Sequence, residues 1–392
     1  MGDKFVTFRQ RAIGLVAAFV LSICLSIGLS KAMAMDGVAA TEYNWNLPEW
    51  TPKPVVPEDN PMSAEKVELG RHLFYEPHLS ITGKYSCATC HKQSLAFTDG
   101  KKVAIGSTDE AHARNSMSLA NVAYSPVLTW ANPLMTSLES QALIPIFGEH
   151  PIEMGMVGQE QQMIQWLQNQ PQYRRMFAEA FAEDKPVNVG NLTEALASFQ
   201  RSLVSFKSPY DRYRYQGEAN AISAAAKRGE KLFNSERLEC FHCHGGINFS
   251  DSLKHEHLAF TETAFHNTGL YNIDGEGSYP PHNTGIQEIT QKTEDMGRFK
   301  VPTLRNIALT APYMHDGSVA NLREAIAHYQ AGGRTIVEGK YAGVGSANPY
   351  KSGFIKGFEI TTSEIDDLVA FLESLTDEEF ITNPDYSDPN KT

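Results

Sequence analysis

The pentapeptide Cys87-Ala88-Thr89-Cys90-His91 is echoed downstream by Cys240-Phe241-His242-Cys243-His244. Two cysteines three positions apart can each bond one vinyl group of a porphyrin as a thioether, and the adjacent histidine can ligate its iron. The alternative is a single zinc ion held by all four cysteines. A histidine directly after each pair favours two covalently bound haem c groups, with His91 and His244 as the proximal iron ligands.

The N-terminus has the pattern of an export signal. Basic residues precede an apolar run over 12–29, and Ala32 and Ala34 form an A-x-A cleavage pattern, which predicts a signal peptide over 1–34. Cleavage as a lipoprotein before Cys24 is disfavoured because the preceding residue is not small. An uncleaved anchor is the alternative, since the run borders on membrane-spanning length. A periplasmic location agrees with the haem interpretation, because bacteria attach c-type haems outside the cytoplasm.

Composition limits the partners of the chain. Its 392 residues are enough for two domains, and 42% of them are hydrophobic, which is too few for a polytopic membrane protein. Loss of the leader would remove four basic residues and one acidic residue and take the formal charge from −12 to −15. This balance argues against nucleic acid and anionic lipid as partners, and for no stable membrane association after signal cleavage.

A second repeat precedes each haem motif. The segment 69–74, Leu-Gly-Arg-His-Leu-Phe, matches 228–233, Arg-Gly-Glu-Lys-Leu-Phe, so a unit of helix, loop and C-x-x-C-H motif is duplicated. No long strand-like alternation is present. We therefore expect an all-α fold of two cytochrome c-like domains, each wrapped around one haem. The expected order is an N-terminal arm over 35–60, a first domain over 61–215, and a second domain over 216–392 with a C-terminal helix and tail.

Local signals place individual helices and loops. A helix is expected to begin at Ser63, and Thr361-x-x-Glu364 is a capping box that opens another helix. Apolar residues at helical spacing predict a further helix over 192–203. The segments 261–298 and 332–357 are rich in Gly, Asn, Pro and His. Loops of this length are often functional, here as haem cover or partner contact, with ordinary surface loops as the alternative.

The chain resembles the bacterial di-haem cytochrome c peroxidase and MauG family over 61–375. Besides the two haem motifs, the resemblance is carried by Arg114-Asn115, Ser118-Leu119-x-Asn121, Trp130, Leu138-Glu139-x-Gln141-Ala142-Leu143-x-Pro145, Pro151-Ile152-Glu153-Met154 and the segment from Val301 to Gly317. The resemblance implies that H2O2 reacts at the first haem and that the second haem is six-coordinate.

In such a protein Gln141, Pro145 and Glu153 form the wall of an open pocket over the first haem. The resemblance implies that Glu153 takes a proton from bound H2O2 and returns one to the leaving oxygen. Gln141 would hold peroxide or water by a hydrogen bond. His112 lies in the loop where other family peroxidases keep a histidine that blocks the first iron. Its spacing to Asn115 differs from that of the blocking ligand, so we favour a bystander, with coordination as the alternative.

The distal ligand of the second iron separates the subfamilies. In the family peroxidases a methionine lies fourteen residues after the histidine of the P-Y-x-H motif, whereas MauG has a tyrosine there. Counting from His315 reaches Tyr329. A tyrosinate stabilises high oxidation states, and methionine favours ferrous iron. His328 is the competing ligand, but helical geometry turns it about 100° away.

Two further features follow from the resemblance. Trp130 matches a tryptophan that lies between the two haems in the family and divides one long electron transfer into two shorter steps. Asn115, Thr310 and Pro312 match the ligands of a calcium ion between the haems, one through its side chain and two through backbone carbonyls. Oxygen donors of this kind suit Ca2+.

The resemblance thus implies a periplasmic haem oxidoreductase that reacts with H2O2, stores two oxidising equivalents over both haems and oxidises a partner. The motifs at 130–133 and 147–151 are most similar to the MbnH-type branch, which implies a Trp or Tyr side chain of a separate protein as the target. The first alternative is a cytochrome c peroxidase that takes electrons from a small redox protein. The second is an electron carrier in which both haems are six-coordinate.

Overall fold

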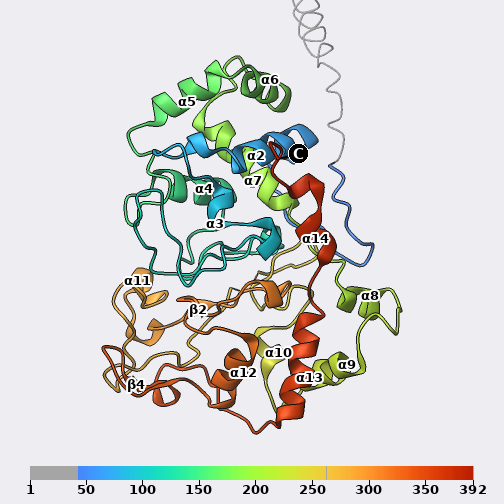
Figure 1. The fold of residues 1–392 in the computed structure, drawn as a ribbon, viewed down its shortest axis with the longest axis vertical. Helices are drawn as coiled ribbons and strands as arrows, with labels where there is room; N and C mark the ends of the chain where they lie inside the picture. The colour runs from blue at the N-terminus through green and yellow to red at the C-terminus, as the bar shows by residue number, and fades with distance from the viewer. Residues whose placement is uncertain (1–42, 262, 392) are drawn as a thin grey trace, which may run out of the picture. The chain divides into compact units, whose positions relative to one another are not determined.

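The computed structural model describes residues 43–261 and 263–391, which form a helix-rich fold (Figure 1). The predicted signal peptide over 1–34 lies outside the described residues. The α-helices are α2 Ala64–Phe74, α3 Cys87–Cys90, α4 Leu138–Phe147, α5 Glu160–Asn169, α6 Pro171–Ala180, α7 Val189–Ser202, α8 Pro209–Tyr215, α9 Ala224–Phe233, α10 Cys240–Cys243, α11 Gln287–Thr290, α12 Leu322–Gln330, α13 Thr362–Glu373 and α14 Glu378–Thr382.

Four short strands accompany these helices in the part of the chain that the structure describes. β1 (Phe265–His266) pairs antiparallel with β2 (Phe299–Lys300), and β3 (Thr335–Ile336) pairs antiparallel with β4 (Gly343–Val344). The sequence analysis predicted no strands, and two-residue pairs are too short to leave an alternating pattern that it could detect. The fold class is therefore helix-rich with a few strands. No helix of the described residues is long and apolar enough to cross a bilayer.

The first core is built on the crossing of α2 and α7. A Cβ atom at Gly70 of α2 would lie 1.9 Å from the carbonyl oxygen of Ala195, so the two backbones can approach this closely only at a glycine. Next to the crossing, Phe74 packs on Phe199 with ring centroids 5.2 Å apart. Apolar side chains of α4 to α6 complete this core.

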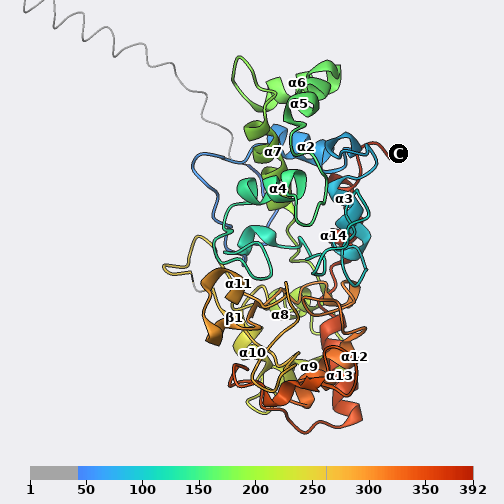
Figure 2. The same cartoon turned by 90° about the vertical axis from the view of Figure 1, so that its left-hand side faces the viewer.

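The crossing of α9 and α13 repeats this arrangement in the second core. A Cβ atom at Gly229 would lie 2.0 Å from the carbonyl oxygen of Asp367, and the Phe233 and Phe371 ring centroids are 5.1 Å apart. The duplication predicted from 69–74 and 228–233 is therefore confirmed in three dimensions. The group of α2 to α7 and the group of α9 to α13 lie at opposite ends of the described fold (Figures 1 and 2).

The predicted helix starts are confirmed. Ser63 caps α2 by accepting a hydrogen bond from the backbone N–H of Lys66 at 3.1 Å. Thr361 and Glu364 form the expected reciprocal capping box at the start of α13. The helix expected over 192–203 is α7, whose last helical residue is Ser202. Side-chain caps of this kind satisfy backbone donors that a helix start leaves without partners.

The C-terminal tail returns to the first core. α14 follows α13, yet Phe380 packs within the first core with its ring centroid 5.6 Å from that of Phe97. The Gln93 side-chain amide donates a hydrogen bond to the Asn383 carbonyl at 2.8 Å. The tail thus joins the two cores, although the sequence analysis placed it in the second domain over 216–392; the domain boundaries remain a prediction.

The described part of the N-terminal arm, 43–60, also contacts both halves. Trp50 stacks on Tyr215 with centroids 3.8 Å apart. The Glu256 backbone N–H donates to the carbonyl of Lys53 at 3.1 Å. Asn60 is buried against α7 and donates to the Glu194 carbonyl at 3.1 Å. The described part of the arm therefore contacts residues of both predicted domains.

The segments 261–298 and 332–357 pack on each other. The Arg334 backbone N–H donates to the Gly269 carbonyl at 2.9 Å, and the Asn348 amide donates to the Tyr271 carbonyl at 2.8 Å. Their aromatic side chains form a third cluster together with the strand residue Phe299. The described residues of these segments, 261, 263–298 and 332–357, are consequently walls of the second half, and several of them line the cavity described next.

Candidate functional site

The two C-x-x-C-H motifs adopt the same geometry. Each cysteine pair forms a single helical turn, α3 or α10, and the following histidine caps its C-terminus. His91 Nδ1 lies 2.8 Å from the carbonyl oxygen of Phe97, and His244 Nδ1 lies 3.0 Å from that of Phe249. A carbonyl can only accept, so each Nδ1 carries the proton and each Nε2 keeps a free lone pair, as an iron ligand requires.

The surroundings of both histidines favour the neutral imidazole. Burial lowers the pKa of His91 and of His244, and a neutral ring is the form that binds a metal. Phe97 and Phe249 both have left-handed backbones, with φ of 61° and 50°. This uncommon conformation at matching positions aims each carbonyl at its histidine.

The four cysteines do not converge on one point. Within 43–261 and 263–391, no cluster of potential metal ligands contains both cysteine pairs. The zinc alternative, which needs all four sulfurs within one tetrahedron, is therefore wrong for this fold.

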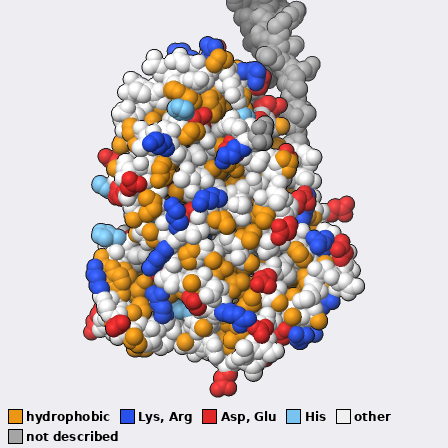
Figure 3. Space-filling view, in the orientation of Figure 1, with side chains coloured by type: hydrophobic (Ala, Val, Ile, Leu, Met, Phe, Trp, Pro, Cys, Tyr) orange, Lys and Arg blue, Asp and Glu red, His pale blue; other side chains and the backbone are white. Residues whose placement is uncertain are grey.

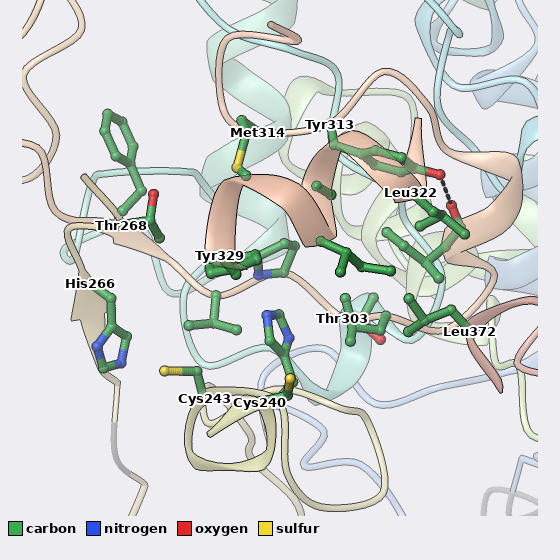
Figure 4. Close-up of a pocket in the computed structure, with 18 of the residues that line it drawn as sticks. Cys240, Cys243, His266, Thr268, Thr303, Tyr313, Met314, Leu322, Tyr329 and Leu372 are labelled. Carbon is green, nitrogen blue, oxygen red and sulfur yellow. Dashed lines mark hydrogen bonds between the residues drawn. The ribbon is translucent and has the colours of Figure 1, made fainter. Parts of the chain in front are cut away.

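A cavity of about 370 Å³ opens beside the second motif. His244 lines this cavity. Cys240 and Cys243 lie on one side of it, and Tyr329 of α12 lies across from them (Figure 4). Most of the lining side chains are apolar, among them Ile326 of α12. The cavity has the position and the lining of a site for a porphyrin attached to these cysteines.

Tyr329 is half-buried at the wall of this cavity, and its phenol makes no hydrogen bond within the described part of the chain. Burial, followed by the nearby Cys243 and Cys240, raises the pKa of the phenol above its usual range. The phenol lines the cavity and has no partner among the described residues, so its oxygen is available to a group in the cavity. The neighbouring His328 does not line the cavity, because its Nε2 lies 3.0 Å from the Thr268 carbonyl oxygen.

Two polar groups in the cavity wall fit the propionates of a haem. His315 is buried against Phe299, ring centroids 3.6 Å apart, and its Nε2 has no hydrogen-bond partner among the described residues. The Lys300 ammonium is buried, and the Val127 carbonyl, 2.8 Å away, is the hydrogen-bond partner that the described residues give it. Both groups line the cavity and lack an anion that would satisfy them. The residues present therefore fit the group that the cysteine motif implies.

Trp130 lines the same cavity, which extends to Thr98, next to the His91 acceptor Phe97. The Trp130 indole N–H donates to the Asn115 carbonyl at 2.8 Å, and the Asn115 backbone N–H donates to the His315 carbonyl at 2.8 Å. The indole is thus fixed in the wall of this cavity by the backbone of Asn115, which is in turn bonded to the backbone of His315.

The structure also brings the three predicted calcium ligands to one region. Asn115, Thr310 and Pro312 all line the cavity. The Asn115 amide nitrogen donates to the Lys101 carbonyl at 2.8 Å, while its side-chain oxygen accepts no hydrogen bond within the described chain. A calcium site here remains a prediction.

The residues predicted for the first haem pocket are also neighbours. Gln141 and Pro145 are one helical turn apart on α4 and so lie on the same face of that helix. The Pro145 carbonyl accepts a hydrogen bond from the Met154 backbone N–H at 2.8 Å, which places Glu153 beside α4. Burial, followed by the charges of Asp99 and Glu153, raises the pKa of the Cys90 thiol to about 11. Cys87 of the first motif packs against the core that contains Ala142 and Met154, the residues next to Gln141 and Glu153.

His112 has a position that the sequence analysis did not anticipate. Its Nε2 lies 3.4 Å from Glu153 Oε1. The forty residues between them in the chain leave no periodic signal for this contact. Lys300 and His315 were likewise not predicted as cavity residues. A signal for Lys300 was present in the sequence, because it lies between the apolar residues Phe299 and Val301. A lysine in such a segment indicates a buried charge that has a partner.

The chain belongs to the di-haem cytochrome c peroxidase and MauG family. The family model for di-haem cytochrome c peroxidase matches residues 64–220, and full-length relatives extend the similarity over nearly the whole chain. Family membership makes the protein a haem peroxidase-type oxidoreductase with haem c cofactors.

Three relatives illustrate the range of the family. The methylamine utilization protein MauG of Methylorubrum extorquens is 34% identical over 361 residues, which is 91% of this chain and 91% of the relative. The cytochrome-c peroxidase IdrP1 of Pseudomonas sp. strain SCT is 34% identical over 93% of this chain and 96% of the relative. A crystal structure described as a MauG-like protein associated with microbial copper homeostasis is 48% identical, with a TM-score of 0.87, and covers 89% of this chain and 100% of that one.

Proposed function

We propose that this protein is a periplasmic MauG-like enzyme that uses H2O2 to oxidise a side chain, a Trp or Tyr, of a separate protein. The proposed enzyme has two haem c sites. Cys87, Cys90 and His91 form the first site, and Cys240, Cys243 and His244 form the second. The haem iron, when bound, supplies the electrons that cleave the O–O bond of H2O2.

At the first site Glu153 is the proposed proton-transfer residue. Its carboxylate accepts the proton of one peroxide oxygen and donates it to the other oxygen, which leaves as water, so no net proton is consumed in this step. Gln141 on α4 is placed to hold the peroxide by a hydrogen bond, and Pro145 on the same face leaves the pocket open to a small ligand. Support comes from the backbone contact that brings Glu153 to α4 and from the packing of Cys87 against the same core as Ala142 and Met154.

Trp130 is the proposed relay between the two sites. Its indole N–H is held by a backbone carbonyl and not by a base. An oxidised indole that keeps its N–H proton, because no base is there to take it, becomes the original neutral indole again when it gains an electron. This environment suits repeated electron transfer between the first and the second haem.

The single observation that carries the proposal is the position of Tyr329. Tyr329 lines the cavity across from Cys240 and Cys243, and its phenol has no partner among the described residues, which supports its role as a tyrosinate ligand of the second iron (Figure 4). An anionic oxygen ligand stabilises a high oxidation state of iron. The protein could then hold two oxidising equivalents long enough to reach a distant target.

The target is proposed from similarity. The motifs at 130–133 and 147–151 are most similar to the MbnH-type branch, and the 48% identical structure is of a MauG-like protein. The first similarity favours a tryptophan in a partner protein, and the second favours the MauG-like branch. On the face seen in Figure 3, acidic and basic side chains are interspersed, so that face offers mixed charges to a protein partner and no continuous patch of one sign.

A cytochrome c peroxidase is the second candidate. One observation favours it: Met314 also lines the cavity beside Tyr329, and a thioether is the ligand expected of a peroxidase (Figure 4). Such an enzyme would reduce H2O2 with electrons from a small cytochrome c or cupredoxin.

Titration of the diferric protein with H2O2, followed by absorption and EPR spectroscopy, separates the candidates. The proposed function predicts that one equivalent of H2O2, without any reductant, changes the signals of both haems. A change at one haem only, together with rapid turnover when a reduced cytochrome is added, would show a peroxidase. No reaction would show an electron carrier and end the proposal.

A further inference from the structure

The side chain of Glu153 has one basic neighbour. His112 Nε2 lies 3.4 Å from Glu153 Oε1, and the two side chains are 30% and 31% exposed. No other Lys, Arg or His of the described residues lies within 4 Å of this carboxylate, and the carboxylate accepts no hydrogen bond from the described chain. A glutamate in this situation is free to change rotamer unless His112 holds it.

The backbone of the His112 loop is fixed against the segment that carries Glu153. The Ser107 N–H donates to the Glu153 carbonyl at 2.6 Å, and the Glu110 carboxylate accepts from the Ile152 N–H at 3.1 Å. A Cβ atom at Gly106 would lie 1.8 Å from the carbonyl oxygen of Ile152, so the two segments are in direct backbone contact.

Within the loop, His112 closes a short turn. Its backbone N–H donates to the Ala104 carbonyl at 2.8 Å, and Ile105 and Ala111 form an isolated antiparallel bridge. These bonds set where the His112 side chain begins. The two docked backbones therefore bring the side chains of His112 and Glu153 together.

We propose that His112 is a positioning residue that holds the Glu153 carboxylate over the first haem by donating from Nε2 to Oε1. This inference rests on the proposed role of Glu153. Proton transfer requires the carboxylate to stay within hydrogen-bond reach of the reacting oxygen. A partner on Oε1 leaves Oε2 free to accept the peroxide proton and return it to the leaving oxygen, while the His112 proton stays on its ring.

The proposed role of His112 differs from both expectations for this residue. A bystander would not face the proposed proton-transfer residue. A blocking ligand would direct Nε2 at iron, but here the Nε2 atom is engaged with a carboxylate. An imidazole nitrogen that donates a proton to Glu153 has no lone pair to offer a metal.

The test compares holoenzyme variants His112→Ala, His112→Gln, Glu153→Gln and the double variant His112→Ala/Glu153→Gln. The matched control is His257→Gln, because His257 forms a similar surface contact with Glu256 at 3.3 Å in another loop. The readouts are the second-order rate constant with H2O2 by stopped flow, the dissociation constant of cyanide, and the EPR spectrum of the resting ferric protein.

We expect His112→Ala to react with H2O2 about ten times more slowly and His112→Gln to recover most of the rate, because a glutamine amide can also donate to Oε1. Cyanide affinity and the resting EPR spectrum should stay as in the wild type, and His257→Gln should change nothing. The double variant should be no slower than Glu153→Gln alone, since residues that act as one unit are not additive.

Three results would overturn the inference. Additive effects in the double variant would mean that His112 acts independently of Glu153. A changed resting EPR spectrum in His112→Ala, with tighter cyanide binding, would make His112 an iron ligand. An unchanged rate in His112→Ala would remove it from the site. If Glu153→Gln itself reacts at the wild-type rate, the proposed role of Glu153 is what fails.

Discussion

The Ser205 hydroxyl donates a hydrogen bond to the Asp377 carboxylate at 3.0 Å, and both residues are buried. The Ser205 backbone N–H donates to the side-chain oxygen of Asn121 at 2.7 Å, and the Asp377 N–H donates to that of Asn306 at 2.8 Å. Both asparagines are buried with left-handed backbones, at φ of 56° and 60°. Ser205 and Asp377 are therefore equivalent positions of the two repeats, joined directly to each other.

The contact between Ser205 and Asp377 links the two repeats, and further hydrogen bonds link each repeat to its haem motif. Ser118 Oγ donates to the carbonyl of Ala96, and Thr303 Oγ1 donates to that of Asn248, both at 2.7 Å. Each acceptor directly precedes the phenylalanine whose carbonyl binds a motif histidine. A chain of short polar contacts thus runs from each histidine loop to the buried junction.

The junction also contains an ion pair whose loss should destabilise the protein. Arg305 and Asp211 are almost completely buried, with their charged atoms 2.8 and 3.0 Å apart. Arg305→Met leaves a buried carboxylate without its partner, which should cost roughly 3–5 kcal/mol of unfolding free energy. Chemical unfolding of the holoprotein measures this loss.

The control is the exposed pair of Arg323 and Asp366, where Arg323→Met should cost less than about 1 kcal/mol. Adding Asp211→Leu to Arg305→Met should restore part of the stability, because it removes the unpaired charge. Equal losses at the buried and the exposed pair would contradict the argument.

Haem attachment is tested by removing one cysteine pair. Replacement of Cys240 and Cys243 by Ala should leave one covalent haem, visible by haem stain on a denaturing gel, because a thioether needs a cysteine sulfur. The matched variant with Ala at Cys87 and Cys90 should keep only the other haem. Two retained haems in either variant would disprove the attachment sites.

Glu153→Gln tests the proton-transfer residue. The amide keeps the shape of the side chain but cannot accept a proton, so the reaction with H2O2 should slow roughly 10²–10⁴-fold. Cyanide should still bind the first haem. The exposed Glu149 in the adjacent loop is the control, and Glu149→Gln should react normally. A wild-type rate in Glu153→Gln would remove this residue from the mechanism.

Tyr329→His distinguishes the two candidate functions. Imidazole is a competent ligand, so the second haem should remain six-coordinate, but without an anionic oxygen it should no longer share the oxidising equivalents. Absorption and EPR spectra after one equivalent of H2O2 measure this difference. H2O2 consumption should survive while oxidation of a partner protein fails.

The control is Tyr313→Phe, which alters another tyrosine of the cavity, whose phenol donates to the Ile307 carbonyl. It should behave as wild type. Identical spectra for Tyr329→His and wild type would show that Tyr329 does not ligate, and the peroxidase candidate would then take its place.

Lys300 gives a pH-dependent prediction. In the chain without haem, burial lowers the pKa of Lys300 to about 8, so the charged lysine prevails only below that pH. A haem propionate beside the ammonium would raise this pKa again, since an opposite charge favours the charged form. Lys300→Met should therefore lower the midpoint potential of the second haem, and the difference from wild type should persist well above pH 8.

Redox titrations of both proteins between pH 6 and about 10 provide the measurement. If the difference in midpoint potential disappears as the pH rises through about 8, the lysine has no anionic partner. Lys351 serves as the control. Burial also lowers the pKa of Lys351, but this lysine is less deeply buried than Lys300, and Lys351→Met should leave the midpoint potential unchanged.

The sequence alone determined the features that are written in contiguous residues. The cysteine spacing defined both haem motifs, and Ser63, Thr361 and Glu364 marked helix starts, because capping depends on residues within one turn. The repeated Gly-x-x-x-Phe at 70–74 and 229–233 identified two equivalent helices, since the glycine is needed at each crossing and the phenylalanine fills each core. The family motifs supplied the remaining candidate residues by resemblance.

The tertiary structure alone decided which distant residues meet. The pairing of His112 with Glu153, the burial of Lys300 and His315 at one cavity, and the return of Phe380 to the first core all join residues far apart in the chain. Such contacts leave no periodic pattern in a single sequence, because the side chain at each position packs against a residue that is distant in the chain. They arise only when the backbone of one segment is docked on another, and that docking is a property of the whole folded chain.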